Sequence, residues 1–424
     1  MANLKVDTVS GIGTEGTVFD GGLKFRSKNY LTLPKGTTTE RTATSSGIST
    51  ETGSIRYNTD SNKMECYIGD KWMIVSTSSP NLDGGTRGLI LGGQHSSPGP
   101  GVTNVIEKIT ISTAGNGTDF GDLLANSRDM GSAASRTRGL TLGRANNEDV
   151  ISFVTIAQEG NAIDFGNLTA PTQANLGGTG SSTRGLIAGG QRFPAQVNVI
   201  DLITFSSTGN AIDFADLTVA RGQTSGSGSQ TRGIFGGGQP GPSVVDTIDY
   251  VTIASTGTNA ADFGNLTSTR RMLTAASSPT RSLFFAGLNP SATNVIDFIT
   301  ISTTANATDF GDISAAMYSS GAVSSKTRAV MMGGYVAPTY VNTMEYVTIA
   351  TRGNAMDFGD LTEPTYLFEP VSNSIRGVRM GGTSPLDTPI DYINIASKGD
   401  AVFFGNLTAK HVEGAGLSNA HGGL

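Results

Sequence analysis

The amino-acid sequence predicts an all-β protein whose larger part is built from seven repeated units. Glycine is unusually frequent, with 57 residues in 424, and charged residues make up only 15% of the chain. Gly, Ser, Thr, Asn and Ala dominate, while the good helix formers Lys and Glu are scarce, so turns and strands are favoured over helices. We therefore expect almost no helix. Two short motifs, each occurring seven times, set the number of units.

The first motif is Thr-Arg-Gly or a close variant, and the second is Asp-Phe, which lacks its Asp in the last unit. The arginines of the first motif are 46 to 51 residues apart, and the phenylalanines of the second are 45 to 49 apart. A period near 50 residues is typical of a β-propeller with four strands in each blade. The motifs occur at Arg87, Arg138, Arg184, Arg232, Arg281, Arg328 and Arg376, and at Phe120, Phe165, Phe214, Phe263, Phe310, Phe358 and Phe404.

Each unit can be divided into four strands. In the first unit, residues 86–93 form a strand that ends in a Gly pair, and residues 104–111 form the next. The second of these is nearly continuously apolar, as expected for a strand buried on both faces between neighbouring blades. A turn and a short outer strand with Asp-Phe-Gly follow. The last segment is small and polar, as in residues 130–135, and fits the crowded axis of a ring.

The chain termini predict how the ring closes. The first unit begins at its Thr-Arg-Gly strand and has no small inner strand before it, whereas the last unit continues into an additional segment at 411–419. We expect this segment to pair with residues 86–93 and complete the first blade. Such pairing would remove two open sheet edges.

A Gly pair at a strand end, an aromatic-bearing strand and an outer aromatic together resemble Kelch repeats. The resemblance covers residues 81–424 and implies a seven-bladed Kelch-like propeller with four-stranded blades. Phe replaces the outer Trp that is typical of Kelch repeats. The resemblance is therefore one of architecture, and it does not carry over the functions of animal Kelch proteins.

The first 80 residues form a separate region of different composition. They contain six of the ten lysines, the only Trp and the only Cys, and we place the boundary at residues 77–80. Residues 54–76 predict three short strands with turns at 60–62 and 69–70. Residues 35–53 are rich in Thr and Ser and are interpreted as a linker or an extended arm.

The pattern Gly-Ser-Ile-Arg-Tyr-Asn-Thr, then Glu-Cys-Tyr, then Trp72, resembles a module of bacteriophage tail fibres and other virion appendages. The opening Asn-Leu-Lys-Val-Asp-Thr-Val resembles structural proteins of marine cyanobacterial phages. These resemblances imply a non-enzymatic virion protein, made in the host cytoplasm and located in the virion. Residues 1–80 would attach it to other virion structural proteins, with a homotrimer as one arrangement, and the propeller would bind a virion protein or host cell-surface glycan.

Composition argues against several other classes of function. The net charge is −6 with no basic block, so nucleic-acid binding is not expected. No secretory signal and no apolar run of about 18 residues occurs, so membrane insertion is not expected. One cysteine, Cys66, permits no intrachain disulfide, and three histidines do not form a metal cluster or a copper-oxidase site.

The repeated polar motifs are interpreted as structural. Asp-Phe-Gly holds a metal in protein kinases, but here it recurs in register without the other kinase motifs, so we expect Asp to cap a turn and Phe to pack between blades. A Ca²⁺ site would need an ordered run of carboxylates that the turns lack. We therefore expect no catalytic residue, cofactor or metal.

The arginines of Thr-Arg-Gly leave two interpretations open. They would either bind an acidic sugar or, as we favour, pair with acidic residues of the adjacent strand. Those acidic residues are Glu107, Asp201, Asp249, Asp297, Glu345 and Asp391.

Departures from the repeat lie in the loops that follow the Gly pairs, all of which should emerge on one face. Exposed loops on a rigid scaffold are where recognition usually occurs. The candidate recognition residues are Arg192, Phe193, Tyr335 and Tyr340. Neutral variation of surface loops is the competing explanation. The alternative functions are a free bacterial Kelch-type lectin or scaffold and a glycan-degrading propeller enzyme.

Overall fold

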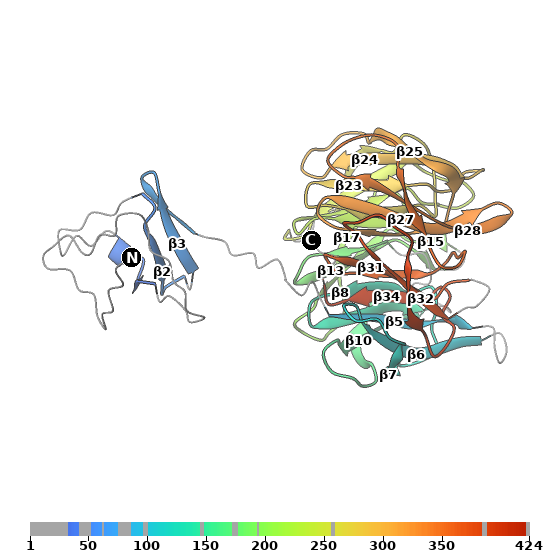
Figure 1. Cartoon of the computed structure of the whole chain (residues 1–424), viewed down its shortest axis with the longest axis horizontal. Coiled ribbons are helices and arrows are strands. Elements are labelled where there is room, and N and C mark those ends of the chain that lie inside the picture. The colour runs from blue at the N-terminus through green and yellow to red at the C-terminus, as the bar shows by residue number, and fades with distance from the viewer. Residues whose placement is uncertain are drawn as a thin grey trace, which may run out of the picture. The chain divides into compact units, whose positions relative to one another are not determined.

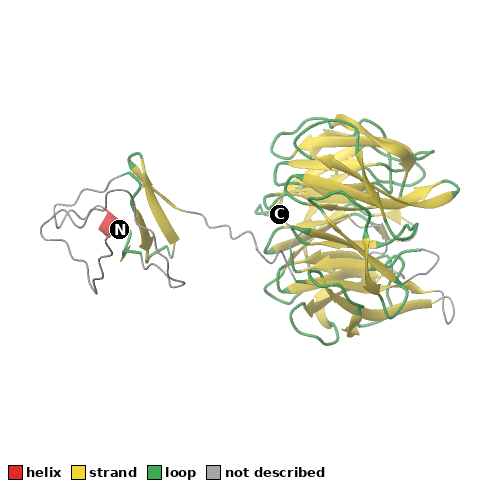
Figure 2. Cartoon of the chain, viewed as in Figure 1, coloured by secondary structure: helices red, strands yellow, loops and turns green. Residues whose placement is uncertain are grey.

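The chain divides into two compact units, Met1–Pro80 and Asn81–Leu424. The computed structural model describes residues 33–41, 52–61, 63–74, 86–95, 101–144, 148–171, 177–192, 195–255, 259–383 and 388–420. Within these ranges the regular structure is strand, apart from one 3-10 turn, η1 (Thr39–Arg41), as the composition predicts (Figure 2). The strand labels used below are those of Figure 1.

The described part of the first unit is a four-stranded sheet in the order β1-β2-β3-β4. The turns at 59–61 and 69–70 connect its last three strands, as residues 54–76 predict. Parallel pairing of β1 with β2 adds an edge strand that the sequence did not indicate. The strands are β1 (Lys35–Gly36), β2 (Ile55–Asn58), β3 (Lys63–Ile68) and β4 (Lys71–Ile74).

The two faces of this small sheet differ in an unusual way. On one face Glu65 is fully buried and is bound by the guanidinium of Arg41 and by Asn58. On the other face the pairing aligns Ile55, Cys66 and Met73. Ile55 and Met73 are 46% and 52% exposed. Glu65 is therefore covered, although Ile74 opposite it is 52% exposed, and the apolar face is open within the described residues.

The second unit is all-β and propeller-like, composed of four-stranded antiparallel sheets with the small inner strand at one edge and the Asp-Phe strand at the other (Figure 1). The first of these sheets has the order β34-β5-β6-β7. Its strands are β34 (Ala415–Ser418), β5 (Arg87–His95), β6 (Gly101–Thr110) and β7 (Thr118–Asp122). β34 pairs antiparallel with β5, from Ala415 opposite Leu91 to Ser418 opposite Gly88.

The remaining sheets repeat this arrangement along the chain. An additional two-stranded sheet is formed by β14 (Gln191–Arg192) and β15 (Ala195–Gln196). The four-stranded sheets are β8 (Gly131–Ala134), β9 (Arg138–Arg144), β10 (Glu148–Thr155), β11 (Ile163–Asn167); β12 (Gly177–Gly180), β13 (Arg184–Ala188), β16 (Val199–Thr204), β17 (Ile212–Asp216); β18 (Ser225–Gly228), β19 (Arg232–Gly236), β20 (Thr247–Thr252), β21 (Ala261–Asn265); β22 (Thr274–Ser277), β23 (Arg281–Phe285), β24 (Thr293–Thr300), β25 (Thr308–Met317); β26 (Gly321–Ser324), β27 (Arg328–Val336), β28 (Thr339–Thr348), β29 (Met356–Asp360); and β30 (Glu369–Ser372), β31 (Arg376–Met380), β32 (Pro389–Asn394), β33 (Val402–Asn406).

The hydrophobic core of this unit lies between neighbouring sheets. In β23, Phe284 packs in the cluster shared with the preceding sheet, and Phe285 packs in the cluster shared with the following one. Burial on both faces explains why these strands do not alternate between apolar and polar residues. Burying each such side chain contributes about 1.5–3 kcal/mol.

Candidate functional site

The Thr-Arg-Gly arginines hold neighbouring sheets together through backbone carbonyls. Each donates from Nη1 to a carbonyl oxygen of the next sheet, as Arg138 does to Phe205 at 2.7 Å. Several also lie over an aromatic ring of their own sheet, with Arg328 4.4 Å from the Tyr346 ring centroid. The carbonyl partner that recurs in each unit is, in chain order of the arginines, Ile156, Phe205, Ile253, Ile301, Ile349, Ile395 and Ile111.

The predicted pairing of these arginines with acidic residues of the adjacent strand is wrong. In the first sheet Arg87 lies opposite Thr110, whereas Glu107 lies opposite Ile90. The register thus places the carboxylate three residue pairs away from the guanidinium. These arginines are engaged between sheets, and an acidic sugar is not needed to explain them.

The acidic residues instead form buried links to the preceding sheet. Asp249 and Asp297 accept hydrogen bonds from Thr218 and Thr267. Each also pairs with a fully buried arginine, Arg221 at 2.8 Å and Arg270 at 2.7 Å. The threonine two residues after the outer strand is therefore part of the contact between sheets. Asp391 accepts a hydrogen bond from Thr362 of the preceding sheet, but its buried partner Arg379 lies opposite it in its own sheet. Glu345 accepts from the backbone of Ser314.

Glu107 and Asp201 occupy the same position with different partners. Burial alone would raise the pKa of Glu107, but hydrogen bonds from His411 and from the Thr408 backbone outweigh it and lower the pKa. Among the described residues, only Thr169 binds the Asp201 carboxyl group. Burial raises the pKa of Asp201 to about 6. These carboxylates are satisfied by structural contacts and face no open site.

The Asp-Phe-Gly motif lies within the outer strand, at an irregularity in its register, and does not make the predicted turn. The predicted capping by Asp and packing of Phe are present. The Asp carboxylate accepts the N–H of the following Gly, for example Asp309 from Gly311 at 2.9 Å. The Phe is buried, with Phe310 in the core between two sheets. Gly311 has φ +144°, and a Cβ there would lie 2.5 Å from the backbone of Gly353 in the next sheet. The glycine thus permits direct backbone contact between sheets.

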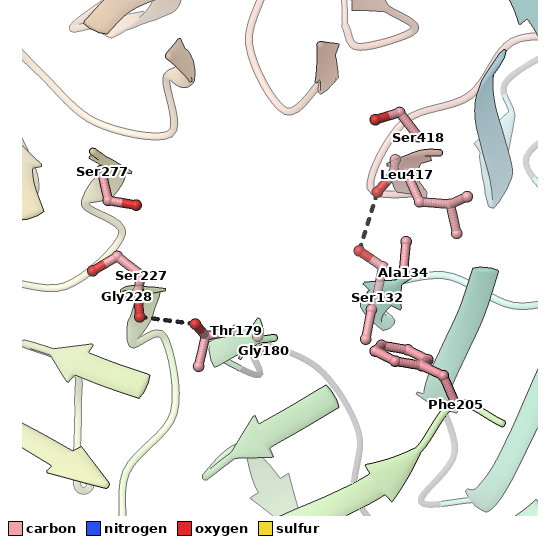
Figure 3. Close-up of a pocket in the computed structure, with 13 residues that line it drawn as sticks. Ser132, Ala134, Thr179, Gly180, Phe205, Ser227, Gly228, Ser277, Leu417 and Ser418 are labelled. Carbon is pink, nitrogen blue, oxygen red and sulfur yellow. Dashed lines mark hydrogen bonds between the residues drawn. The ribbon is translucent and has the colours of Figure 1, made fainter. Parts of the chain in front are cut away.

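A cavity of about 300 Å³ lies among the inner strands, at their C-terminal ends (Figure 3). The labelled hydroxyl groups surround a central space in this view. They are engaged by neighbouring inner strands: Ser132 donates to the Gly416 carbonyl, and Thr179 donates to the Ser227 carbonyl. At this end, hydrogen bonds link small residues of neighbouring inner strands.

A second cavity of about 280 Å³, which we call the loop-face cavity, lies where the inner strands begin. The Gly pairs and the variable loops are at this same end, because inner strands run antiparallel to the Gly-pair strands. Its charged lining residues are Asp129, Glu369 and Glu413. Burial raises the pKa of Glu369 to about 8, and burial together with Glu413 raises that of Asp129 to about 6.

Four tyrosines beside this cavity form what we call the tyrosine patch: Tyr318, Tyr335, Tyr340 and Tyr366. Tyr335 has its ring centroid 5.2 Å from that of Tyr318 and 5.5 Å from that of Tyr366. Tyr340 stacks on Tyr366 at 5.5 Å and 24°. All four rings are half-buried, and their hydroxyls make no hydrogen bond within the described residues.

The structure thus places two of the four predicted recognition residues, Tyr335 and Tyr340, in one patch. The backbone of Arg192 is in β14, and its side chain and Phe193 lie outside the described residues. Sequence reasoning missed Tyr318 and Tyr366, which precede inner strands in successive units. They are 48 residues apart, which is one repeat. The occurrence of a tyrosine at the same position of two successive units could therefore have revealed them.

The described residues contain no group of three or more His, Cys, Asp or Glu side chains placed to hold a metal ion. No helix of membrane-spanning length and hydrophobicity is found in the described part of the chain. No protein-family model matches the sequence. No curated protein matches it either.

Proposed function

We propose that this chain is a non-enzymatic structural protein of a phage virion, a fibre or appendage. Residues 1–80 attach it to the particle, and residues 81–424 form a closed, seven-bladed Kelch-type propeller that binds a host surface or another virion protein. The observation that carries the proposal is the combination of an open apolar sheet face in the first unit with a loop face in the second.

Contacts between the last and first sheets support a closed ring. Arg376 donates to the Ile111 carbonyl just as each preceding arginine does to its own next sheet. Thr408 likewise donates its N–H to Glu107. One hydrophobic cluster contains Ile90 and Ile109 of the first sheet together with Val378 and Phe404 of the last. The contact that repeats along the chain therefore recurs between its two ends.

The exposed face of Ile55, Ile68 and Met73 supports attachment through the first unit. Ile68 is 58% exposed and follows Cys66 by two residues, so it lies on the same face. An apolar surface rimmed by polar residues is typical of a protein interaction site. In the second unit, the first strand, β5, begins at Arg87, and Gly92 and Gly93 lie toward its other end. The loop face is thus at the other end of β5 from Arg87.

The repeated motifs also favour binding over catalysis. The Asp-Phe-Gly carboxylates bind a backbone N–H of their own strand, the Thr-Arg-Gly guanidiniums join sheets, and Asp249 and Asp297 are in buried ion pairs. The differences among units lie at the loop face. A free lectin and a glycan-degrading enzyme are the alternatives, and the second would release oligosaccharides from host polysaccharide.

Mass spectrometry of purified virions of the encoding phage tests the proposal. We expect the chain in the particle, and we expect Ile68→Lys with Met73→Lys to abolish its incorporation while the second unit stays folded. Ile212→Lys changes an equally exposed isoleucine of the second unit (61% exposed) and is the control. Absence of the wild-type chain from virions, or normal incorporation of the double variant, would contradict the proposal.

A further inference from the structure

The tyrosine patch presents aromatic faces from two neighbouring sheets at one place. Tyr335 and Tyr340 come from the extended hairpin of β27 and β28, and Tyr366 precedes β30 of the next sheet. Half-exposed tyrosines offer an apolar face and a polar edge at low entropic cost, since each ring has few rotatable bonds. Neighbouring rings at different angles form a surface for stacking.

The patch continues into the loop-face cavity through adjacent residues. Ser319 and Ser320 follow Tyr318, and Leu367 follows Tyr366; all three line the cavity. The Ser320 and Thr224 hydroxyls, which belong to the cavity lining, are buried and have no hydrogen-bond partner within the described chain. A buried hydroxyl without a partner costs free energy, so a ligand that binds these groups would recover it.

The charged groups decide which ligand chemistry fits. The cavity-lining charges are the carboxyl groups of Asp129, Glu369 and Glu413. Arg128, which is 3.1 Å from Glu413 and 3.7 Å from Asp129, is the basic partner of this cluster. A carboxyl group hydrogen-bonds to hydroxyl groups whether it is protonated, as Glu369 is at neutral pH, or ionised, and the ionised groups repel anions. The ligand should therefore carry several hydroxyl donors and apolar C–H faces without net negative charge.

We infer that the tyrosine patch and the loop-face cavity together bind an uncharged glycan, with sugar rings stacked on the tyrosines and a terminal sugar reaching the cavity. This inference rests on the proposed function, because it specifies the class of host-surface ligand that the loop face takes. It places recognition on one side of the loop face, across the sixth and seventh sheets of the second unit.

The test is binding of the purified full-length chain to an array of neutral and acidic bacterial surface polysaccharides, followed by titration of the best neutral hit. We expect neutral glycans to bind and acidic ones to bind less. Tyr335→Ala and Tyr366→Ala should each weaken affinity about tenfold or more, whereas Tyr335→Phe should retain most of it. Ser320→Ala should weaken binding without lowering the melting temperature.

Phe403→Ala is the matched control, because Phe403 is an exposed aromatic (53%) on the outer strand β33, away from the patch. Its affinity should equal that of the wild type. Binding confined to acidic glycans or to polycations, binding only to proteins, no binding to any neutral glycan, or tyrosine variants that bind normally would each overturn the inference. Because the assay uses isolated protein, its outcome is independent of whether the chain is found in virions.

Discussion

At the scale of single residues, one buried position shows how the repeat tolerates different chemistry. The acid that links each sheet to its neighbour is paired with Arg221 for Asp249 and with Arg270 for Asp297, whereas Glu107 is hydrogen-bonded to His411. A buried carboxylate must be paired or protonated, but the pairing group need not be the same. The sequence pattern revealed the acid at each repeat and not its partner, because the partner lies outside the strands, in the segment between an outer strand and the next inner strand.

Two arginine substitutions should lower stability by different amounts, because one breaks a buried ion pair and the other breaks a hydrogen bond between sheets. Arg270→Met should lower the free energy of unfolding by about 3–5 kcal/mol, because it leaves Asp297 buried without its charge partner. Arg281→Met removes a hydrogen bond to the Ile349 carbonyl and a contact with the Phe298 ring, and should cost about 1–2 kcal/mol. Urea denaturation measures both. Equal losses would contradict the assignment of the buried role to Arg270.

The cavity carboxyl groups predict how stability changes with pH. The pKa of Glu369 in the fold is raised to about 8, so the folded state binds a proton that the unfolded chain has released. Its contribution is therefore largest at acidic pH and is lost as the pH rises through about 8; Asp129 acts similarly around pH 6. We expect the melting temperature to fall from pH 5 to pH 9.

Glu369→Gln should make this decline shallower, because the amide cannot ionise. Glu363→Gln, a change in the loop before β30, is the control and should leave the decline as in the wild type. An unchanged slope in Glu369→Gln would show that this carboxyl group does not carry the effect.

At the scale of elements, the Asp-Phe-Gly segment of the outer strand joins sheets by backbone contact. Gly311 and Gly353 both have positive φ, +144° and +151°, but only at Gly311 would a Cβ meet the neighbouring backbone, and nothing lies within 4 Å of a Cβ at Gly353. The sequence shows two repeated glycines and does not distinguish them. The difference arises from where the two glycines lie. Gly311 is in the outer strand of one sheet, and this strand contacts the loop of the next sheet that contains Gly353.

Alanine at these two glycines should therefore have unequal effects. Gly353→Ala should cost about 1–3 kcal/mol from backbone conformation alone. Gly311→Ala adds a clash between backbones, and we expect a clearly larger loss. Thermal unfolding of the two variants checks this, and equal losses would show that the sheets can separate here without cost.

At the scale of the whole molecule, β34 joins the end of the second unit to its beginning. It pairs with β5, and Asn419 accepts hydrogen bonds from the backbone N–H groups of Thr86 and Arg87. Truncation after Lys410 would leave β5 as an open edge and expose the Leu89 and Leu91 side of the core. We expect loss of cooperative unfolding and aggregation in size-exclusion chromatography.

Truncation after Ala420 keeps every described strand and is the control for this experiment. It should behave as the full-length chain does. A stable, monomeric protein ending at Lys410 would show that the C-terminal strand is dispensable for the unit.

By itself, the sequence determined the strand content, the repeated units and the pairing of residues 415–418 with the first sheet, because small, apolar and turn-forming residues recur with a fixed period. It also indicated Tyr335 and Tyr340 as departures from that period. Only the tertiary structure decided that the motif arginines bind carbonyl groups, that the acids pair with other residues, and that Tyr318 and Tyr366 complete the patch. These contacts join residues of different sheets, and their geometry depends on register and packing that a one-dimensional pattern does not contain.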